Sequence, residues 1–506
     1  MDKLTRLASE STISQRCMSI TRNLLALTRR GIVRIFVLVL GLIGVIVFIQ
    51  RSAGLPFNLI EEYQSMFLGN ALDNATIQAM EYSKPIQEPY KEQFWEVGLR
   101  LKQVNRWLSE IEQKPRNKKA LHGAVERVIA GLFPFLRTFS PSSPLAALRK
   151  SFRPGSRGIV IPVGGSENAI RYAGHLITSL RVVLGCTLPI QIAYAGDGDL
   201  SENDKQRILQ IDGATDVTFF DVLSVFDDST LKLAEGGWAI KAFAALGSDL
   251  EQVILLDSDA VFLQKPDVLF EQHPYIQYGA YLFHDRLLWQ HAFADRHAWF
   301  KDQIKEPSPA MAKSLVWTED YAEECDSGVV VLDKSRPDVL MGLLHIAWQN
   351  THAVREEITY KITYGDKESW WMGLELAGSG YEFEAHYGSI LGWPGEKIGK
   401  PAPGRVCSFV IAHVDGDDNL IWYNGGLLKN KLTKPDEYDV PEVWMIDGTW
   451  EKGGSKQDMS CMYGKEVKQL TEDQRLVLGR SIEGAKAVDR LLASSKVSRT
   501  DGSSPT

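Results

Sequence analysis

Short apolar runs and amphipathic segments alternate along the middle of this 506-residue chain. The runs have the length of buried strands, and the segments between them repeat apolar residues every three or four positions, as one face of a helix does. This alternation predicts an α/β domain over residues 156–430 with a mostly parallel sheet and helices on both faces. Strands are expected at 158–165, 188–197, 216–223, 252–259, 278–284, 327–334, 382–391 and 405–415, and helices at 167–185, 201–211 and 236–247.

An apolar run precedes this domain. No residue from Ile35 to Ile49 is charged, and the run begins at Ile32 with Arg34 as its only interruption. An 18-residue helix spans about 27 Å, close to the ~30 Å hydrocarbon core of a bilayer. Basic residues dominate the segment before the run, so we expect a cytoplasmic tail over 1–31, a transmembrane anchor over 32–50 and a lumenal remainder. A buried globular helix and a cleaved signal peptide are the alternatives.

The segment 51–155 is expected to be a stem with helical parts. Between Phe94 and Ile111 apolar residues recur at spacings of three and four, which predicts one apolar helix face. That face either packs on the main domain or joins two copies of the chain. Asn74 begins an Asn-Ala-Thr glycosylation acceptor, which a lumenal location would expose to modification.

The remaining composition narrows the classes of function. The net charge of −8 gives no support for a nucleic-acid partner. Four of the five cysteines follow the expected anchor and permit three complete disulfide pairings, between which the sequence does not choose. Residues 431–506 have a weaker pattern and read as a C-terminal extension, with a disordered end from Ser494.

Two carboxylates stand one residue apart where the apolar strand 252–256 ends. Asp257 and Asp259 share one face of the extended chain, and ligands of α/β sheets bind beyond the carboxyl ends of the strands. Paired carboxylates in such a crevice suit a hard divalent cation. The alternative is an ordinary acidic turn.

Other polar residues sit at comparable positions. His413 follows an apolar strand and is the expected third metal ligand, with a core or surface histidine as the alternative. Lys241, on the helix before the Asp strand, either reaches a phosphate or lies on a solvated face. Trp370 and Trp371 either stack on a sugar ring or pack in the core. The further candidates are Gly164 and Gly165 for binding of the donor and Asp326, Asp366 and Glu368 for catalysis.

Taken together, "ILLDSDAVFL", "GGWAIKAFAAL", "CDSGVVVLDK" and "GDKESWWMGLELAG" resemble the fungal Golgi α-mannosyltransferases of glycosyltransferase family 71 over roughly residues 155–425. The resemblance implies a GT-A fold, GDP-mannose as the donor, Mn²⁺ as the metal, retention of the α-anomer, a glycan or glycoprotein acceptor and a Golgi membrane location. The α-1,3 linkage is the expected one.

The sequence leaves alternatives to this function open. One is an α-1,2-mannosyltransferase or a transferase that uses another nucleotide sugar. Another is a membrane protein that binds glycans or acts as a scaffold without turnover, and a third is a glycoside hydrolase. The P-loop, His-Glu-x-x-His and Gly-x-Ser-x-Gly motifs do not occur, which argues against a P-loop nucleotidase, a zincin peptidase and a typical serine hydrolase.

Overall fold

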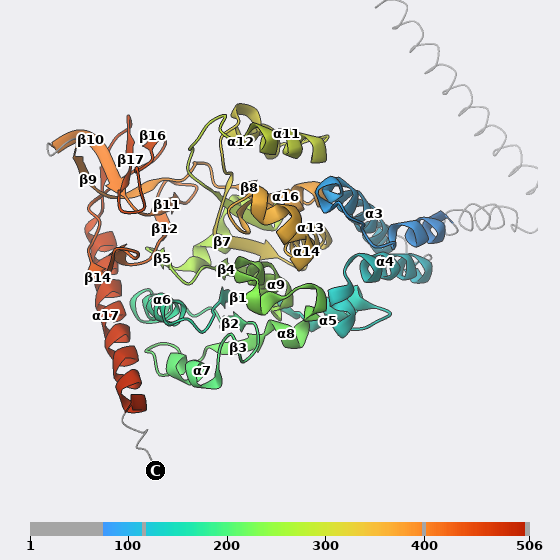
Figure 1. Cartoon of the computed structure of the whole chain (residues 1–506), viewed down its shortest axis with the longest axis horizontal. Helices are drawn as coiled ribbons and strands as arrows, with labels where there is room; N and C mark the ends of the chain where they lie inside the picture. The colour runs from blue at the N-terminus through green and yellow to red at the C-terminus, as the bar shows by residue number, and fades with distance from the viewer. Residues whose placement is uncertain (1–73, 114–117, 397–400, 501–506) are drawn as a thin grey trace, which may run out of the picture. The chain divides into compact units, whose positions relative to one another are not determined.

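A computed structural model describes residues 74–113, 118–396 and 401–500 (Figure 1). The expected tail and anchor and the first part of the stem, up to residue 73, lie outside the described residues. Within the described part, no helix is long and apolar enough to cross a membrane. The described residues from Ala75 onward form one compact unit.

A seven-stranded sheet forms the centre of this unit, in the order β3-β2-β1-β4-β7-β6-β8. All of its strands run in the same direction except β7, which is antiparallel to both neighbours. Ile159 of β1 lies opposite Ile190 of β2 and Ile254 of β4, which fixes the register at the centre. The predicted mostly parallel sheet is confirmed. Its strands are β1 (Arg153–Pro162), β2 (Ile190–Tyr194), β3 (Thr218–Asp221), β4 (Leu250–Leu256), β6 (Ala280–His284), β7 (Cys325–Asp333) and β8 (Glu382–Phe383).

Helices cover both faces of the sheet, as the alternating side chains of its strands require. Ile159 and Ile161 of β1 belong to the same core cluster as Ile170 and Leu176 of α6 (Glu167–Thr178). On the other face, α9 (Ile240–Gly247) packs on β1, β2 and β4 (Figure 1). Helices α13 (Pro337–Gln349) and α16 (Lys367–Ala377) pack on β7.

The predicted apolar stripe of the stem lies on α3 (Phe94–Gln113), and all six of its residues are buried. The helix packs against α13 and α16. At Gly98 a Cβ atom would lie 2.4 Å from the carbonyl oxygen of Leu376, so the two helices touch at backbone distance. Packing on the main domain is therefore confirmed, and the stripe is not available to join two copies. The neighbouring helices α4 (Lys118–Leu132) and α5 (Pro144–Ser151) belong to the same unit.

Smaller antiparallel sheets follow the central one. A six-stranded sheet has the order β16-β17-β10-β9-β15-β18, and β11, β12 and β5 form a three-stranded sheet. Cys407 and Cys461 are directly opposed on β10 and β17 and form a disulfide, whereas Cys186 and Cys325 are buried free thiols. The expected strands 382–391 and 405–415 are each divided in two. The bounds are β5 (Ala260–Phe262), β9 (Ile390–Glu396), β10 (Pro401–Ser408), β11 (Ile411–Val414), β12 (Leu420–Asn424), β13 (Leu428–Asn430), β14 (Lys434–Tyr438), β15 (Val443–Met445), β16 (Thr449–Glu451), β17 (Ser460–Tyr463) and β18 (Lys468–Gln469).

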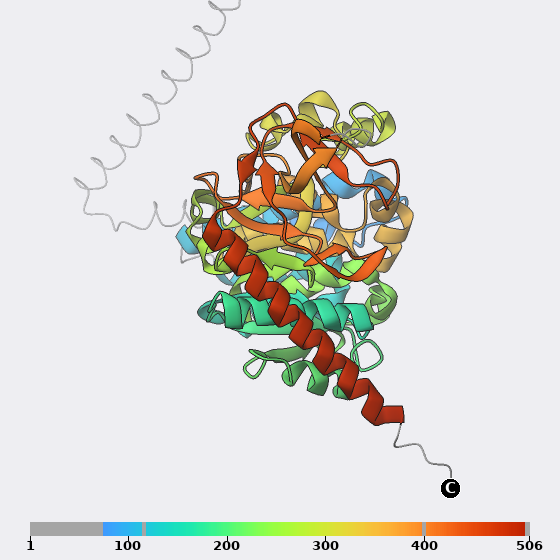
Figure 2. The ribbon, with the colours of Figure 1, turned by 90° about the vertical axis from the view of Figure 1, so that its left-hand side faces the viewer.

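A long helix, α17 (Glu472–Thr500), crosses α6 (Figure 2). Asp489 of α17 accepts hydrogen bonds from both Arg171 (2.6 and 2.8 Å) and Tyr438 (2.5 Å), and one of its oxygens lies 2.8 Å from the ring of His175. The helix extends to Thr500, so the disordered end expected from Ser494 does not begin there. The other helices are α7 (Glu202–Leu209), α8 (Val222–Val225), α10 (His273–Tyr278), α11 (Ala294–Gln303), α12 (Leu315–Glu319), α14 (His352–Val354) and α15 (Tyr360–Ile362).

Candidate active site

The turn Asp257-Ser258-Asp259 emerges at the carboxyl end of β4. The N–H of Asp257 donates to the carbonyl of Gly328 on β7 at 2.8 Å, and the chain re-enters a sheet at Ala260 of β5. Strand β4 lies beside β1, on the side away from β2 and β3, so the direction in which successive strands are added reverses here. Ligands of open α/β sheets bind at such switch points.

Two neighbouring cavities of about 560 and 520 Å³ adjoin this turn. Both are lined by Trp238, Lys241, Asp257 and Asp259. The cavity that is also lined by the end of β1 is called the first cavity. The cavity that is lined by β7 and α16 is called the second cavity. The two sequence-predicted carboxylates therefore stand where both spaces meet.

Gly164 and Gly165 line the first cavity, as expected for residues that bind the donor. A Cβ atom at Gly164 would lie 2.8 Å from Oδ1 of Asp199, and one at Gly165 would lie 2.3 Å from the carbonyl oxygen of Asp199. Gly165 thus requires glycine, because the backbone of the loop after β2 passes directly against it, whereas at Gly164 the side chain of Asp199 can move aside. This close passage forms the wall of the cavity.

Lys241 is buried rather than solvated, and it lines both cavities. Its Nζ lies 2.9 Å from Oδ1 of Asp257 and 3.1 Å from Oδ2 of Asp366. It also donates to the carbonyl and hydroxyl oxygens of Ser327, at 2.7 and 3.0 Å. Burial disfavours its charge, but the carboxylates of Asp257 and Asp366 outweigh burial and raise the pKa of Lys241 above its usual value.

The electrostatics of Asp257 differ from those of an exposed carboxylate. Burial raises its pKa to about 6, Lys241 opposes that rise, and the negative charges of Asp259 and Asp366 add to it. A further cation beside the pair would remove this mutual repulsion. The three carboxylates therefore make a site that attracts positive charge.

Asp259 contacts Lys431, which was not among the site residues expected from the sequence. Its Oδ2 forms an ion pair with the ammonium group of Lys431, which lies between β13 and β14. Lys431 comes 172 residues later in the chain, and only the pairing of β12 with β5 brings the two segments together. Lys431 lines the second cavity too.

The donor set at this turn fits a divalent cation that takes few ligands from the protein. Within the described part of the chain, no three His, Cys, Asp or Glu side chains are grouped as a metal site. Asp257 and Asp259 supply two carboxylates at the cavity wall. Cations of the magnesium type are commonly held by one or two carboxylates, with substrate phosphates and water as the remaining ligands. The residues thus fit a cation that binds together with a diphosphate.

His413 does not belong to this donor set, which corrects its assignment as a metal ligand. Its side chain is fully buried, stacks on Trp422 and does not line either cavity. One ring nitrogen contacts Glu384, and the other lies 3.3 Å from Oδ2 of Asp326. Burial disfavours its charge, but these two carboxylates raise the pKa of His413 to about 9. Both ring nitrogens therefore face carboxylates rather than the Asp turn.

Asp326 and Asp366 both line the second cavity and are held rigidly. Oδ1 of Asp326 accepts hydrogen bonds from the N–H of Gly328 and the amide of Asn424, each at 2.9 Å. Oδ2 of Asp366 accepts from Nε1 of Trp370 at 2.7 Å, in addition to its contact with Lys241. Asp326 is the second residue of β7 rather than a residue before the strand. Asp326 and Asp366 therefore remain candidates for a catalytic role.

Glu368 does not reach either cavity, which corrects its candidacy as a catalytic residue. It is fully buried on α16 and accepts hydrogen bonds from the N–H groups of Glu324 (3.0 Å) and Cys325 (3.3 Å). Nε1 of Trp371 donates to its other oxygen at 2.6 Å. Burial raises the pKa of Glu368 to about 8. Glu368 therefore holds the start of β7 against α16.

The aromatic residues at the cavities are not those expected from the sequence. Trp370 and Trp371 are fully buried, so the core-packing alternative is correct for them. Instead Trp238 and Tyr364, with exposed fractions of 49% and 62%, line the second cavity with ring centroids 5.4 Å apart. An exposed aromatic pair at a cavity offers a stacking surface. Its only signal in the sequence is the glycine beside each ring, at Gly237 and Gly365.

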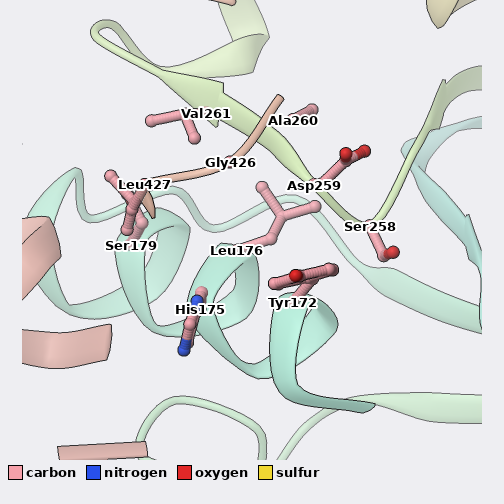
Figure 3. A pocket seen from close by; sticks show the side chains of 10 residues that line it. All are labelled: Tyr172, His175, Leu176, Ser179, Ser258, Asp259, Ala260, Val261, Gly426 and Leu427. Carbon is pink, nitrogen blue, oxygen red and sulfur yellow. The ribbon is translucent and has the colours of Figure 1, made fainter. Parts of the chain in front are cut away.

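A small hollow of about 10 Å³ separates the Asp turn from α6 (Figure 3). Tyr172, His175 and Leu176 of α6 line this hollow, and Leu176 lies between the helix and the turn (Figure 3). His175 is the residue that contacts Asp489 of α17. The helix beneath the carboxylates is thus connected to the C-terminal helix.

Solved structures of glycosyltransferases show a weak likeness to the chain. A structure of the galactosyltransferase LgtC with donor and acceptor sugar analogues is 17% identical, with a TM-score of 0.29, over 45% of this chain and 73% of that one. The apo form of mouse xyloside xylosyltransferase 1 is 12% identical, with a TM-score of 0.29, over 44% of this chain and 81% of that one.

Relatives from Saccharomyces cerevisiae cover more of the chain. The alpha-1,3-mannosyltransferase MNN1 is 27% identical over 60% of this chain and 44% of the relative. The alpha-1,3-mannosyltransferase MNT2 is 26% identical over 56% and 54%, respectively. The chain thus spans about half the length of these curated relatives.

The model of the family described as "Mannosyltransferase putative" matches residues 156–415. This segment is just over half of the 506 residues and contains the Asp turn, Lys241, Asp326 and Asp366. It also coincides with the segment whose motifs resemble the fungal enzymes. The chain belongs to this family of mannosyltransferases.

Proposed function

We propose that this protein transfers mannose from GDP-mannose to a mannose-containing glycan, with a divalent cation, expected to be Mn²⁺, at Asp257 and Asp259. One observation carries the proposal: in a chain of a mannosyltransferase family, the Asp turn stands at the sheet's switch point, where two cavities meet. The strand order is compatible with a GT-A fold, which we infer for residues 156–430. We infer an α-1,3 linkage from the named relatives and retention of configuration from the resemblance to family 71.

The two cavities suit the two substrates of such a transfer. The first cavity, with the glycine wall at Gly164 and Gly165, is assigned to the nucleotide, and the second to the acceptor glycan. When bound, the cation would supply charge neutralisation for the departing diphosphate. Lys241 keeps Asp257 and Asp366 at fixed positions beside it.

The two buried carboxylates of the second cavity are suited to the transfer step. Asp326 and Asp366 are anchored by hydrogen bonds, so neither needs to reorganise when positive charge develops at the transferred sugar. One of them stabilises that charge or orients the acceptor hydroxyl. The exposed pair Trp238 and Tyr364 provides a surface against which a sugar ring can stack.

The identity of the donor gives a direct test. Isothermal titration in the presence of Mn²⁺ should show GDP binding more tightly than UDP, and binding should weaken when EDTA removes the cation. Radiolabelled mannose should then pass from GDP-mannose to an oligomannose acceptor. A preference for UDP would overturn the named donor and leave the cation site intact. Binding of glycan without transfer from any nucleotide sugar would favour the non-catalytic alternative.

We propose that the enzyme is a single-pass Golgi membrane protein with its catalytic unit in the lumen. The apolar run over 32–50 and the basic segment before it support this topology. The Cys407–Cys461 disulfide is compatible with an oxidising compartment.

Glycosylation of Asn74 reports on this topology. Asn74 is exposed in the structure. Protein from fungal cells should therefore gain mobility on endoglycosidase treatment, and an Asn74→Gln variant should migrate like the treated protein. Protease added to sealed microsomes should spare everything after about residue 50. Digestion of the C-terminal unit in intact microsomes would contradict the proposed orientation.

A further inference from the structure

One wall of the second cavity is formed by residues that follow the segment matched by the family model. That segment ends at residue 415. Lys452, Ser455, Lys456 and Asp458, from the connection between β16 and β17, nevertheless line the cavity. The Cys407–Cys461 disulfide ties β17 to β10 and so holds this connection in place. The C-terminal extension is therefore part of the substrate-binding unit.

Cations outnumber carboxylates on the lining of this cavity, and most of them are paired. Lys241 and Lys431 contact the Asp turn, Lys367 contacts Asp285, and Lys429 lies 2.7 Å from Asp439. The complete set of lining cations is Lys241, Arg286, Lys367, Lys429, Lys431, Lys452 and Lys456, against Asp257, Asp259, Asp326, Asp366 and Asp458.

Three of these cations lack a good carboxylate partner. Neither Lys452 nor Lys456 forms an ion pair with any residue that the structure describes. Arg286 shares Asp285 with Lys367, and its Nε lies 3.5 Å from Oδ1 of that carboxylate without a hydrogen bond. We call Arg286, Lys452 and Lys456 the cationic rim.

The members of the rim are positioned to receive an anion. The guanidinium of Arg286 is fixed over the ring of Trp450, 5.6 Å from its centroid, and its buried Nε has no acceptor within the described residues. Partial desolvation and the positive charges of Arg286 and Lys367 lower the pKa of the exposed Lys452, although the carboxylates of Asp285 and Glu323 oppose this shift. An anion among these groups would relieve that repulsion and accept their unused hydrogen-bond donors.

We propose that the acceptor of this enzyme carries an anionic group, a phosphate or a carboxylate, which binds the cationic rim while its sugar ring lies in the second cavity. This rests on the proposed function, because that function assigns the second cavity to the acceptor. The donor diphosphate is not the group concerned. Arg286, Lys452 and Lys456 line the second cavity and not the first, and the proposed cation at the Asp turn would neutralise the diphosphate.

Direct binding tests the proposal without requiring turnover. The full-length protein is saturated with GDP and Mn²⁺, so that any anion site for the donor is already filled. Three ligands are then titrated: uncharged mannobiose, mannobiose bearing a phosphomonoester, and mannobiose with one ring oxidised to a uronic acid. We expect both charged ligands to bind about ten- to hundredfold more tightly than the neutral one, since charge-assisted hydrogen bonds are strong. The preference should fall as salt is added. The relative affinity of the two charged ligands distinguishes a phosphate from a carboxylate as the natural group.

Substitutions locate the effect on the rim. In a Lys452→Gln/Lys456→Gln variant the preference for charged ligands should fall by about tenfold or more, while mannobiose affinity stays constant. Both lysines are exposed and lack ion pairs among the described residues, so the variant should fold normally. Lys465→Gln is the matched control, because Lys465 is exposed just after β17 and does not line the cavity.

Equal affinity of the wild-type protein for charged and neutral mannobiose would overturn the proposal, as would a preference that the double variant retains. Failure of the proposed function would look different. It would appear as an absence of GDP binding or of mannose transfer to every acceptor, whereas the comparison of charged with neutral ligands would still decide the role of the rim.

Discussion

Replacing Asp259 with Asn is expected to reduce mannose transfer by about 10²–10³-fold, because a metal ion contributes several kcal/mol of charge stabilisation and each 1.36 kcal/mol is a factor of ten. Asn keeps the size of the side chain and much of its hydrogen-bonding capacity but removes one of the two carboxylates at the turn. Initial rates with GDP-mannose, measured against Mn²⁺ concentration, check the prediction.

The fold should survive this substitution. Asp259 pairs with Lys431, whose side chain is 37% exposed, so the unpaired ammonium can turn to water. Loss of such a partly exposed pair costs about 0–1 kcal/mol. Thermal denaturation without metal should therefore give a melting temperature near that of the wild type.

The ligand-dependent part of the stability should change instead. Stabilisation of the wild-type protein by GDP with Mn²⁺ should disappear in the Asp259→Asn variant, since a ligand adds stability only where it binds. Asp458→Asn, which alters another carboxylate of the second cavity, should retain it. An Asp259→Asn enzyme that transfers mannose at the wild-type rate in EDTA would refute the metal site.

The sequence identified the Asp turn because its signal is local. An apolar run that ends in two acids, after three strand-helix units, has few structural explanations. Capping is local in the same way: Ser201 was expected to begin a helix, and its Oγ accepts the N–H of Asp204 at 3.2 Å in the structure. The stripe on α3 was likewise readable from its spacing.

What the sequence did not reveal depends on contacts between distant segments. Lys431 meets Asp259 only because β12 pairs with β5, and His413 is enclosed by Glu384, which follows β8, and by Asp326 of β7. Spacing alone made His413 look like a ligand, but both of its ring nitrogens face these carboxylates rather than the Asp turn. Glu368 is different, because its contact with Trp371 three residues later lies within one helix turn and could have indicated a structural role.

A Lys241→Met substitution is expected to cost about 3–5 kcal/mol of stability, the range for breaking a buried ion pair by removal of one partner. The side chains of Lys241 and Asp366 are 4% and 3% exposed, so neither can recover its lost interaction from water. Asp257 would lose the same cation, although its 29% exposure makes its share smaller. Urea denaturation of the wild type and the variant gives the difference.

A second substitution separates the charge from the packing of Lys241. In Lys241→Met/Asp366→Asn the buried negative charge is removed together with its partner, so part of the lost stability should return. Asp366→Asn alone leaves Lys241 with Asp257 and the two oxygens of Ser327 and should cost less than Lys241→Met. If the double variant is as unstable as the sum of the two single ones, the ion pair is not what holds the floor of the site. The loss of stability in Lys241→Met would then come from lost packing of the aliphatic part of the lysine side chain. Asp366 would in that case have no structural role and would be available to act on the substrate.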